Sequence, residues 1–363
     1  MSVISNKCPN CGGPLGFNPD LQKCKCEFCL SEFTVPEVEA YEAAEAQKAN
    51  SQQEPFNQPE GQINQDSGAS AEHANMRQYN CPSCGASIVT DEVTSAAFCC
   101  YCHNPVIMEE QVSGVFRPEL VLPFKFKREQ AVERLIAWYK KKKFLPKAFI
   151  SQSQLEKITG LYLPYWLTDC DIDASLRAKC ENVSTWRSGN MQYTKTDTYD
   201  VYREASMCFN NIPHDASKKT DDRLTESIEP FDCSEIKPFN PMYLSGFFAE
   251  KYDVDKEAIL PVIKQRTDAA VKQELRSAMQ YNHVHEQGFN TVYNRMTVKY
   301  ALLPIWMITY LYGGKIYTYA MNGQTGKAFG ILPLSKAKLA ALFGGVAAAV
   351  FIALFIFNRG IFF

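Results

Sequence analysis

A repeated cysteine motif constrains this chain more than any other feature. Four cysteines with the spacing C-x2-C-x14-C-x2-C occur twice, 73 positions apart, as Cys8, Cys11, Cys26 and Cys29 and then as Cys81, Cys84, Cys99 and Cys102. Two residues between paired cysteines allow both sulfurs to reach one ion, and two such pairs supply four thiolates for tetrahedral Zn²⁺. The sequence therefore predicts two zinc ribbons and two Zn²⁺ per chain, with these eight cysteines as the ligands.

The alternative interpretation of these pairs is a redox dithiol, and two copies of identical spacing argue against it. Each unit is too short for an adequate core, so the metal must supply most of its folding free energy. Cys24 and Cys100 lie beside ligands without completing a pair and are interpreted as bystanders. His103 could replace a sulfur in the second site, but with four cysteines in place it is interpreted as a surface residue.

The cysteine usage also indicates a compartment. Eight of the fourteen cysteines lie in the short-spaced pairs, and no apolar segment that could act as a secretion signal precedes Cys8. Paired cysteines without a signal are typical of metal thiolates in the reducing cytoplasm. The net charge of −2 gives no overall preference for nucleic acid.

Composition divides the 363 residues into five regions. They are zinc ribbon 1 (1–36), a flexible polar linker (37–78), zinc ribbon 2 (79–112), an α+β globular domain (113–334) and a transmembrane tail anchor (335–363). The linker is too polar to offset its ordering entropy, apart from a short helix expected at 37–49. The predicted fold class is multidomain, with two small all-β zinc ribbons, an α+β globular region and one C-terminal transmembrane helix.

Periodicity predicts several elements inside the α+β region. Apolar residues at helical spacing predict helices over 128–143 and 255–279. Strands are expected at 305–312 and 316–321, joined at Gly313-Gly314 and followed by a turn at 322–326. The segment Leu163–Leu167 resembles Leu303–Met307, because each contains Leu-Pro-x-Trp. This echo suggests two related strand-rich halves.

The run Leu339–Phe357 contains no charged residue. Its 19 residues span roughly 28 Å as a helix, close to the thickness of a bilayer core. The alternative is a buried core helix, which would need apolar cover on every side. Lys336 and Lys338 precede the run and Arg359 follows it, which places the N-terminal side in the cytoplasm. We expect a single-pass protein of the cell membrane with its bulk on the cytoplasmic side.

Charge distribution indicates which partners the chain contacts. From Tyr79 to Val112 there are four acidic residues and neither Lys nor Arg, so the second ribbon lacks the cations that bind phosphates. The basic segment Lys140–Lys143 is either a solvated helix face or a site for anionic lipid headgroups. Small residues such as Gly345 and Ala349 lie on one stripe of the apolar run. The stripe is either a contact for self-association in the bilayer or a set of small residues tolerated in a lipid-facing span.

Enzymatic signatures are weak. The segment Gly323–Lys327 lacks the spacing of a phosphate-binding loop, and His283 and His285 are not followed by a zincin spacing. The lone cysteines Cys170, Cys180, Cys208 and Cys233 have no recognisable base nearby in the sequence. The sequence therefore predicts a protein that is not an enzyme.

Most of the chain, excluding the polar linker, resembles a bacterial family of zinc-ribbon membrane proteins, labelled TFIIB-type or YdjG-like, that is associated with the phage-shock protein A envelope-stress system. The resemblance is carried by five segments: Cys8–Gly12, Cys81–Gly85, Val121–Phe124, Tyr162–Trp166 and Asn322–Lys327. Leu30 and His103 depart from the family pattern, which has glycine after the second pair.

The resemblance implies a membrane-anchored cytoplasmic adaptor that recruits a homologue of phage-shock protein A during envelope stress. The alternative function is a membrane-tethered nucleic-acid-binding regulator that uses the ribbons and the Lys140–Lys143 segment. Nucleic acid is the less favoured partner because the ribbons have no surplus of cations.

Overall fold

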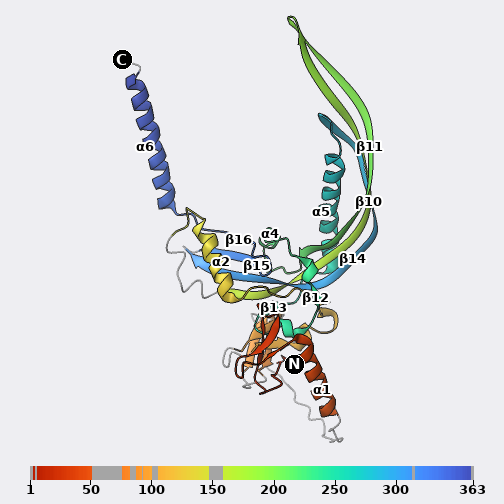
Figure 1. Cartoon of the computed structure of the whole chain (residues 1–363), viewed down its shortest axis with the longest axis vertical. Coiled ribbons are helices and arrows are strands. Elements are labelled where there is room, and N and C mark those ends of the chain that lie inside the picture. The colour runs from red at the N-terminus through yellow and green to blue at the C-terminus, as the bar shows by residue number, and fades with distance from the viewer. Residues whose placement is uncertain are drawn as a thin grey trace, which may run out of the picture.

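The computed structural model describes residues 3–4, 6–50, 76–81, 87–91, 93–99, 105–146, 158–312 and 315–360. Most regular structure in these ranges is β-strand (Figure 1). The helices longer than a single turn are α1 (Val35–Asn50), α2 (Arg128–Lys140), α4 (Asp222–Ser227), α5 (Lys256–Ser277) and α6 (Lys336–Gly360).

An 11-stranded mixed sheet forms the centre of the molecule. Its main path runs β1 (Val3–Ile4), β8 (Pro105–Met108), β7 (Thr94–Phe98), β13 (Phe248–Glu250), β10 (Thr159–Ser188), β14 (His283–Tyr312), β15 (Lys315–Asn322) and β16 (Ala328–Gly330). Off this path, β10 also pairs with β11 (Met191–Asp215), and β14 pairs with β9 (Leu120–Val121), which pairs with β12 (Lys237–Pro238). The contacts of β10 with β13 and of β14 with β9 are parallel.

This architecture corrects the predicted fold class. The prediction of two small all-β zinc ribbons beside a separate α+β region is wrong. The described chain is mostly β, and strands from the cysteine-rich segments belong to the large sheet. Strand β7 pairs with β13 through Ala96 and Ala249, and β1 pairs with β8 through Ile4 and Ile107. Such pairing joins residues far apart in the chain, so no local pattern in the sequence indicates it.

Several local predictions are confirmed. Helix α2 covers most of 128–143, α5 covers most of 255–279, and α1 covers 37–49. Strands β14 and β15 form the expected hairpin and pair through Tyr312 and Lys315, although its turn at 313–314 lies outside the described residues. Residues 51–75 of the predicted linker also lie outside them.

The three longest strands extend from the central sheet as a curved projection (Figure 1). We call this projection the β arm and define it as Cys170–Ser188 of β10, Met191–Phe209 of β11 and His283–Met296 of β14. Helix α5 lies on its concave side (Figure 1). At the tip, Trp186 stacks on its cross-strand neighbour Tyr193, with ring centroids 5.7 Å apart.

Strict alternation in the sequence builds the arm's inner face. Every second residue of β10 is buried there, namely Cys170, Ile172, Ala174, Leu176, Ala178 and Cys180. Helix α5 buries a stripe of residues four apart, namely Ile259, Ile263, Thr267, Val271 and Leu275, of which Val271 and Leu275 pack against that face. Burial raises the pKa of the Cys170 and Cys180 thiols. These two lone cysteines are therefore core residues of the arm.

The outer face of the arm is charged. Asp171 pairs with Arg295 at 2.9 Å across β10 and β14, and just below the arm Asp169 pairs with Lys299 at 2.9 Å. Such cross-strand ion pairs are partly exposed, so each contributes little to stability. The arm therefore has an inner face that α5 covers and an outer face that is exposed to solvent.

The two Leu-Pro-x-Trp segments are neighbours in the sheet. Leu163 of β10 lies opposite Leu303 of β14, so the echo in the sequence corresponds to direct antiparallel pairing. Proline lacks an N–H and is unusual in central strands. Here the carbonyls of Pro164 and Pro304 accept hydrogen bonds from Ala216 and Gly323, which lie outside the β10–β14 pair.

Three of the segments that carry the family resemblance meet at Phe124. Its ring contacts Tyr162 and Trp306 with centroids 5.0 Å away in each case, and it stacks on Phe247 at 4.2 Å. A Cβ at Gly323 would lie 2.7 Å from the Phe124 ring, so only glycine fits there. These segments therefore form the aromatic centre of the main core.

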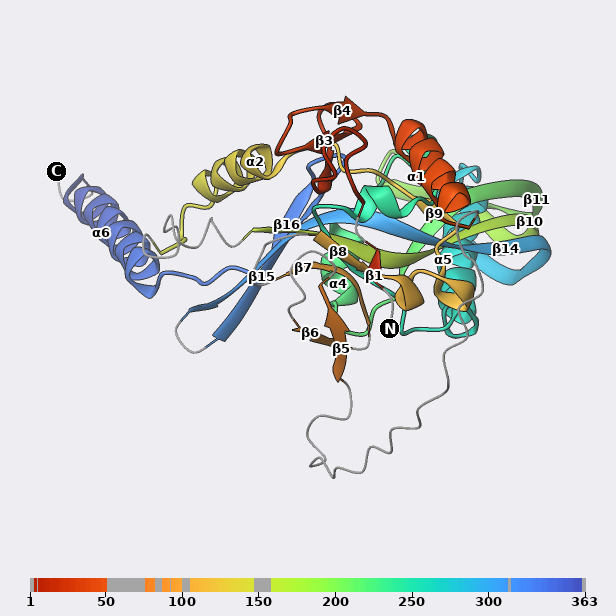
Figure 2. The same cartoon turned by 90° about the horizontal axis from the view of Figure 1, so that it is seen from below.

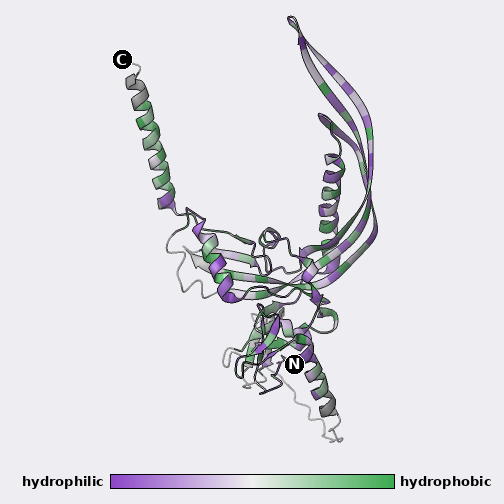
Figure 3. Ribbon diagram, viewed as in Figure 1, coloured by the Kyte–Doolittle hydropathy of each residue, from purple (hydrophilic) through white to green (hydrophobic). Residues whose placement is uncertain are grey.

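Helix α6 leaves the body on the same side as α2 (Figures 1 and 2). Within the described chain, it is the one helix long and apolar enough to cross a membrane, through Lys336–Phe355. None of this segment is buried against the rest of the protein, which argues against the alternative of a core helix. Figure 3 shows that it changes from hydrophilic at its base to hydrophobic along its length.

Candidate metal centre

The first cysteine set lies in a three-stranded sheet of β2 (Leu15–Asn18), β3 (Lys23–Cys26) and β4 (Glu32–Phe33). We call residues 6–34 the cysteine unit. Before β2, the Cys8 N–H donates to Gly13 O at 2.7 Å, and the Gly12 N–H donates to Cys8 O at 2.8 Å. Gly12 has a φ of 72°, which glycine adopts without strain. This tight turn brings the side chains of Cys8 and Cys11 to one side.

A second turn of the same kind follows β3. The Leu30 N–H donates to Cys26 O at 3.0 Å, as Gly12 does to Cys8. Leu30 has a φ of 61°, a conformation that costs a residue with a Cβ about 1–2 kcal/mol. Its side chain is exposed, so nothing in the core holds it there. The departure from glycine at this position therefore preserves the turn but strains it.

The two turns bring four sulfurs together. Cys8 Sγ lies 3.6 Å from Cys29 Sγ, Cys11 Sγ lies 3.5 Å from Cys26 Sγ, and all four sulfurs lie within 4.8 Å of one another. Thiolates about 2.3 Å from a tetrahedral Zn²⁺ would be about 3.8 Å apart, which matches this cluster. The cluster can hold a metal ion, and within the described ranges it is the one group of three or more potential ligands.

The surroundings of the cluster favour the thiolate form of Cys29. The Ser31 hydroxyl and backbone N–H lower the pKa of Cys29 to about 6. By contrast, burial raises the pKa of Cys24 to about 12, so this neighbouring cysteine stays protonated and packs in the core. The interpretation of Cys24 as a bystander agrees with this position.

Four cysteine ligands leave a tetrahedral ion without an open position for water or substrate. Catalytic zinc sites keep such a position, whereas structural sites are closed. Gly13 adds to the enclosure, because a Cβ there would lie 3.4 Å from Cys11 Sγ and 3.5 Å from Cys26 Sγ. The arrangement suits a metal that stabilises the fold.

The cysteine unit packs directly on the body. The Phe17 N–H donates to Ser245 O at 2.9 Å, and the Ser245 hydroxyl donates to Leu15 O. The Phe17 ring meets Tyr243 edge-on with centroids 5.0 Å apart. Leu15 and Phe17 belong to the same buried cluster as Phe124. The unit therefore shares the main core.

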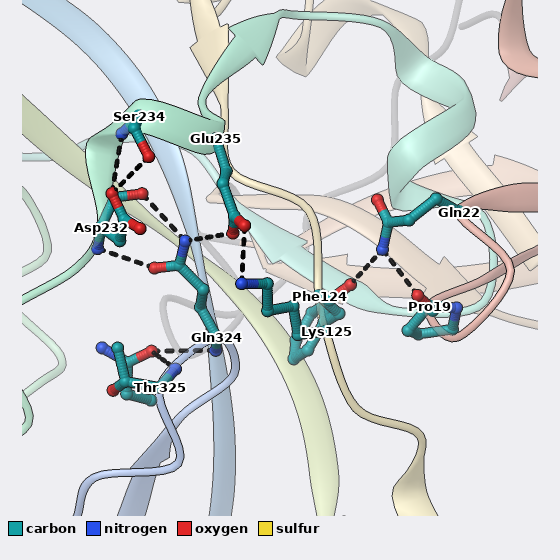
Figure 4. Close-up of polar contacts among 10 residues, drawn as sticks. Pro19, Gln22, Phe124, Lys125, Asp232, Ser234, Glu235, Gln324 and Thr325 are labelled. Atoms are coloured by element: carbon teal, nitrogen blue, oxygen red, sulfur yellow. Dashed lines mark hydrogen bonds and ion pairs between the residues drawn. The ribbon is translucent and has the colours of Figure 1, made fainter.

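Gln22 provides a second attachment. Its Nε2 donates to Pro19 O at 2.6 Å within the unit and to Phe124 O at 2.8 Å in the body (Figure 4). The next residue, Lys125, pairs with Glu235 at 2.6 Å. The Gln324 Nε2 donates to the same Glu235 carboxylate at 2.6 Å. A continuous set of polar contacts thus links the cysteine unit to the turn at 322–326.

That turn holds the segment 228–235. The buried Asn322 donates from Nδ2 to Ile228 O and Pro230 O, and its Oδ1 accepts the N–H groups of Gln324 and Thr325. The Gln324 side chain also exchanges two hydrogen bonds with the Asp232 backbone, each 2.8 Å long. The Asn-Gly-x-Thr-Gly element is therefore structural. The sequence predicted its turn but not its contacts.

The second cysteine set is described in part. Cys81 follows β5 (Met76–Asn80), which pairs with β6 (Ser87–Asp91), and Cys99 follows β7. Both cysteines are buried in one small cluster with Tyr79, Ile88, Ala97, Val106 and Met108. Cys84, Cys102, Cys100 and His103 lie outside the described residues.

Comparison with known proteins identifies a relative along almost the whole chain. The protein YdjG of Bacillus subtilis (strain 168) is 30% identical over 360 residues, which cover 97% of this chain and 96% of that protein. The chain belongs to the YdjG family. YdjG itself is described only as uncharacterized. No family model and no solved structure matches the chain.

Proposed function

We propose that this member of the YdjG family is a membrane-anchored scaffold that recruits a protein partner on the cytoplasmic side. The observation that carries the proposal is the combination of an unburied apolar helix and a long β arm whose strand β11 pairs with β10 alone in the described sheet. The earlier resemblance points to a homologue of phage-shock protein A as the partner. No catalytic role is proposed, since the described sulfur cluster suits a closed structural site.

The arm supplies the recruiting surface. Within the described sheet β11 pairs with β10 alone, so its other edge leaves backbone N–H and C=O groups unpaired over most of 25 residues. Open edges pair readily with strands of other chains. Large side chains are also exposed there: Trp186, Met191, Tyr193, Tyr199 and Tyr202. Aromatic residues and Met are enriched in protein interfaces.

Zinc serves as a structural element in this proposal, with two ions per chain. The first is held by Cys8, Cys11, Cys26 and Cys29, and the second by Cys81, Cys84, Cys99 and Cys102. The shared burial of Cys81 and Cys99 supports the second site. Metal analysis of the reduced protein should return two equivalents, falling to one in Cys11→Ser and in Cys84→Ser. Fewer than two equivalents in the folded wild-type protein would contradict the second site.

The proposed topology places the body in the cytoplasm and α6 across the cell membrane as a single pass. Lys336 and Lys338 lie at the N-terminal end of the span, where positive charge marks the cytoplasmic side. Reduced cysteines require the same side. Self-association through Gly345 and Ala349 stays a prediction, and the space around Gly345 is open.

The nucleic-acid alternative receives less support from the arrangement. Helix α2 begins beside the cysteine unit, where Lys127 pairs with Asp20 at 2.8 Å. The Lys140–Lys143 segment lies at the other end of this 13-residue helix, about 20 Å away. The basic segment and the sulfur cluster therefore do not form one surface.

Recruitment to proteoliposomes tests the proposal. The full chain is reconstituted, and the purified phage-shock protein A homologue is added and sedimented with the vesicles. We expect co-sedimentation to fall by at least about tenfold for Trp186→Ala with Tyr193→Ala, as hot-spot residues of an interface do. The control is Val115→Ala with Phe329→Ala, which removes exposed apolar side chains from other elements. Equal binding by wild-type protein and both double variants would contradict the arm as the docking surface.

A further inference from the structure

The base of α6 is fastened to the end of α2 by backbone-directed contacts. The Ser335 N–H donates to Phe144 O at 2.8 Å. The Lys338 ammonium donates to Leu145 O at 2.8 Å and to Lys143 O at 3.4 Å. These contacts join residues almost 200 positions apart. They hold the Lys140–Lys143 segment beside the point where the apolar span begins.

This junction concentrates positive charge. Lys140, Lys141, Lys142, Lys143 and Lys336 are all exposed, and we call these five residues the lysine collar. No acidic residue occurs in 134–145 or in 331–357. None of the ion pairs found among the described residues involves a collar lysine. Carboxylates of the described residues therefore do not neutralise this charge.

Apolar and aromatic groups surround these cations. Lys142 lies over the Trp138 ring at 4.8 Å from its centroid, and Ile331 and Leu334 are exposed next to the start of α6. Aromatic rings with cations beside an apolar span are typical of the headgroup region of a bilayer. This composition differs from that of a solvated helix face.

We propose that the lysine collar binds anionic lipid headgroups at the membrane surface where α6 enters the bilayer. The inference rests on the proposed insertion of α6. An inserted α6 would hold the five ammonium groups near the headgroups, within the distance over which a negative surface potential acts. The same placement turns the collar toward the bilayer, which favours lipid over nucleic acid as the anionic partner.

Lipid retention tests the collar in the full-length protein. The chain is reconstituted into bilayers of phosphatidylcholine with a minor fraction of phosphatidylglycerol. Insertion is verified by resistance to alkaline extraction, and the lipids that remain after mild detergent extraction are measured by mass spectrometry. We expect phosphatidylglycerol to be enriched about threefold or more over the bulk ratio at low salt, and less at high salt.

Two matched variants locate the site. Lys140→Gln with Lys141→Gln, Lys142→Gln and Lys143→Gln removes four exposed cations but retains the carbonyls that accept from Lys338. The control removes four exposed cations elsewhere, by Lys179→Gln, Lys218→Gln, Arg223→Gln and Lys256→Gln. Enrichment should return to the bulk ratio in the first variant and persist in the control. Unchanged metal content confirms that each variant is folded.

The outcomes separate this inference from the proposed function. A wild-type chain that does not insert overturns both proposals. An inserted chain that retains the bulk lipid ratio overturns the collar alone, as does equal enrichment in the collar variant. Binding of duplex DNA to the inserted chain that disappears in the collar variant would also overturn it, in favour of a nucleic-acid site.

Discussion

The cysteine unit and the β arm both adjoin the central sheet, and they are stabilised in opposite ways. The cysteine unit has about thirty residues, its strands β2 to β4 are two to four residues long, and its two turns gather four sulfurs that can hold a metal ion. The arm is the outer part of three strands of 25 to 30 residues, and a helix covers one of its faces. The cysteine unit therefore depends on a turn-defined sulfur cluster together with packing on the main core, whereas the arm depends on a continuous apolar face covered by a helix.

The largest expected effect is the loss of one thiolate from the cysteine unit. Cys11→Ser should abolish metal binding there and destabilise residues 6–34 by more than about 4 kcal/mol, as the loss of a structural metal does. Hydrogen exchange should show the unit unprotected while the arm keeps its protection. Loss of protection in both regions would mean that the two are one cooperative unit.

The reciprocal change lies in the arm. Leu176 is fully buried between β10 and α5. Leu176→Ala should destabilise the arm by about 2–5 kcal/mol, because it removes apolar contact and leaves a cavity. Metal content should stay at the wild-type value, as measured by atomic absorption. The exposed Val292→Ala on β14 serves as the control and should change stability by less than about 0.5 kcal/mol.

The base of the arm should respond to pH. Burial raises the pKa of Asp215 to about 7, although the Ser217 N–H donates to its Oδ1 at 2.9 Å. The folded carboxyl thus keeps a proton that the unfolded one releases near pH 4, so stability should fall as the pH rises from about 4 to 7. Asp215→Asn should flatten this dependence in urea denaturation. If the stability of both proteins falls equally with pH, the dependence comes from groups other than Asp215.

The smallest effect concerns the attachment of the cysteine unit. Gln22→Ala removes the hydrogen bond to Phe124 O, which should cost about 1 kcal/mol. Metal binding should persist, but limited proteolysis between the unit and the body should become faster. Exposed Gln192→Ala at the arm tip is the matched control. An equal rate for both variants would show that Phe17 and Ser245 suffice for docking.

Local patterns predicted the features that depend on near neighbours. The spacing of Cys8, Cys11, Cys26 and Cys29 predicted a four-sulfur cluster, and apolar periodicity predicted α2 and α5. Both signals arise within one turn or one helix, so they remain visible in a single sequence.

The features that the sequence did not predict depend on contacts between distant segments. The alternation from Cys170 to Cys180 is typical of a half-buried strand, but it does not indicate that α5, much later in the chain, covers this face. The entry of β7 and β8 into the large sheet is decided by pairing with β13 and β1. The attachment of Gln22 to Phe124 likewise joins residues 102 positions apart. No periodic pattern records such contacts, which explains why the predicted independent ribbons were wrong.

The pairing of β10 with β14 has a consequence for synthesis. Thr159 pairs with Met307, so a ribosome must add nearly 150 residues after β10 begins before the sheet can close. The hairpin of β10 and β11 presents Ile172 and Leu176 uncovered until α5 has been made, and β10 still lacks its partner β14 after that. Such late closure slows folding and leaves apolar surface open to aggregation. The nascent chain should therefore depend on chaperones during this interval, and ribosome profiling of bound chaperone would place their release after residue 312.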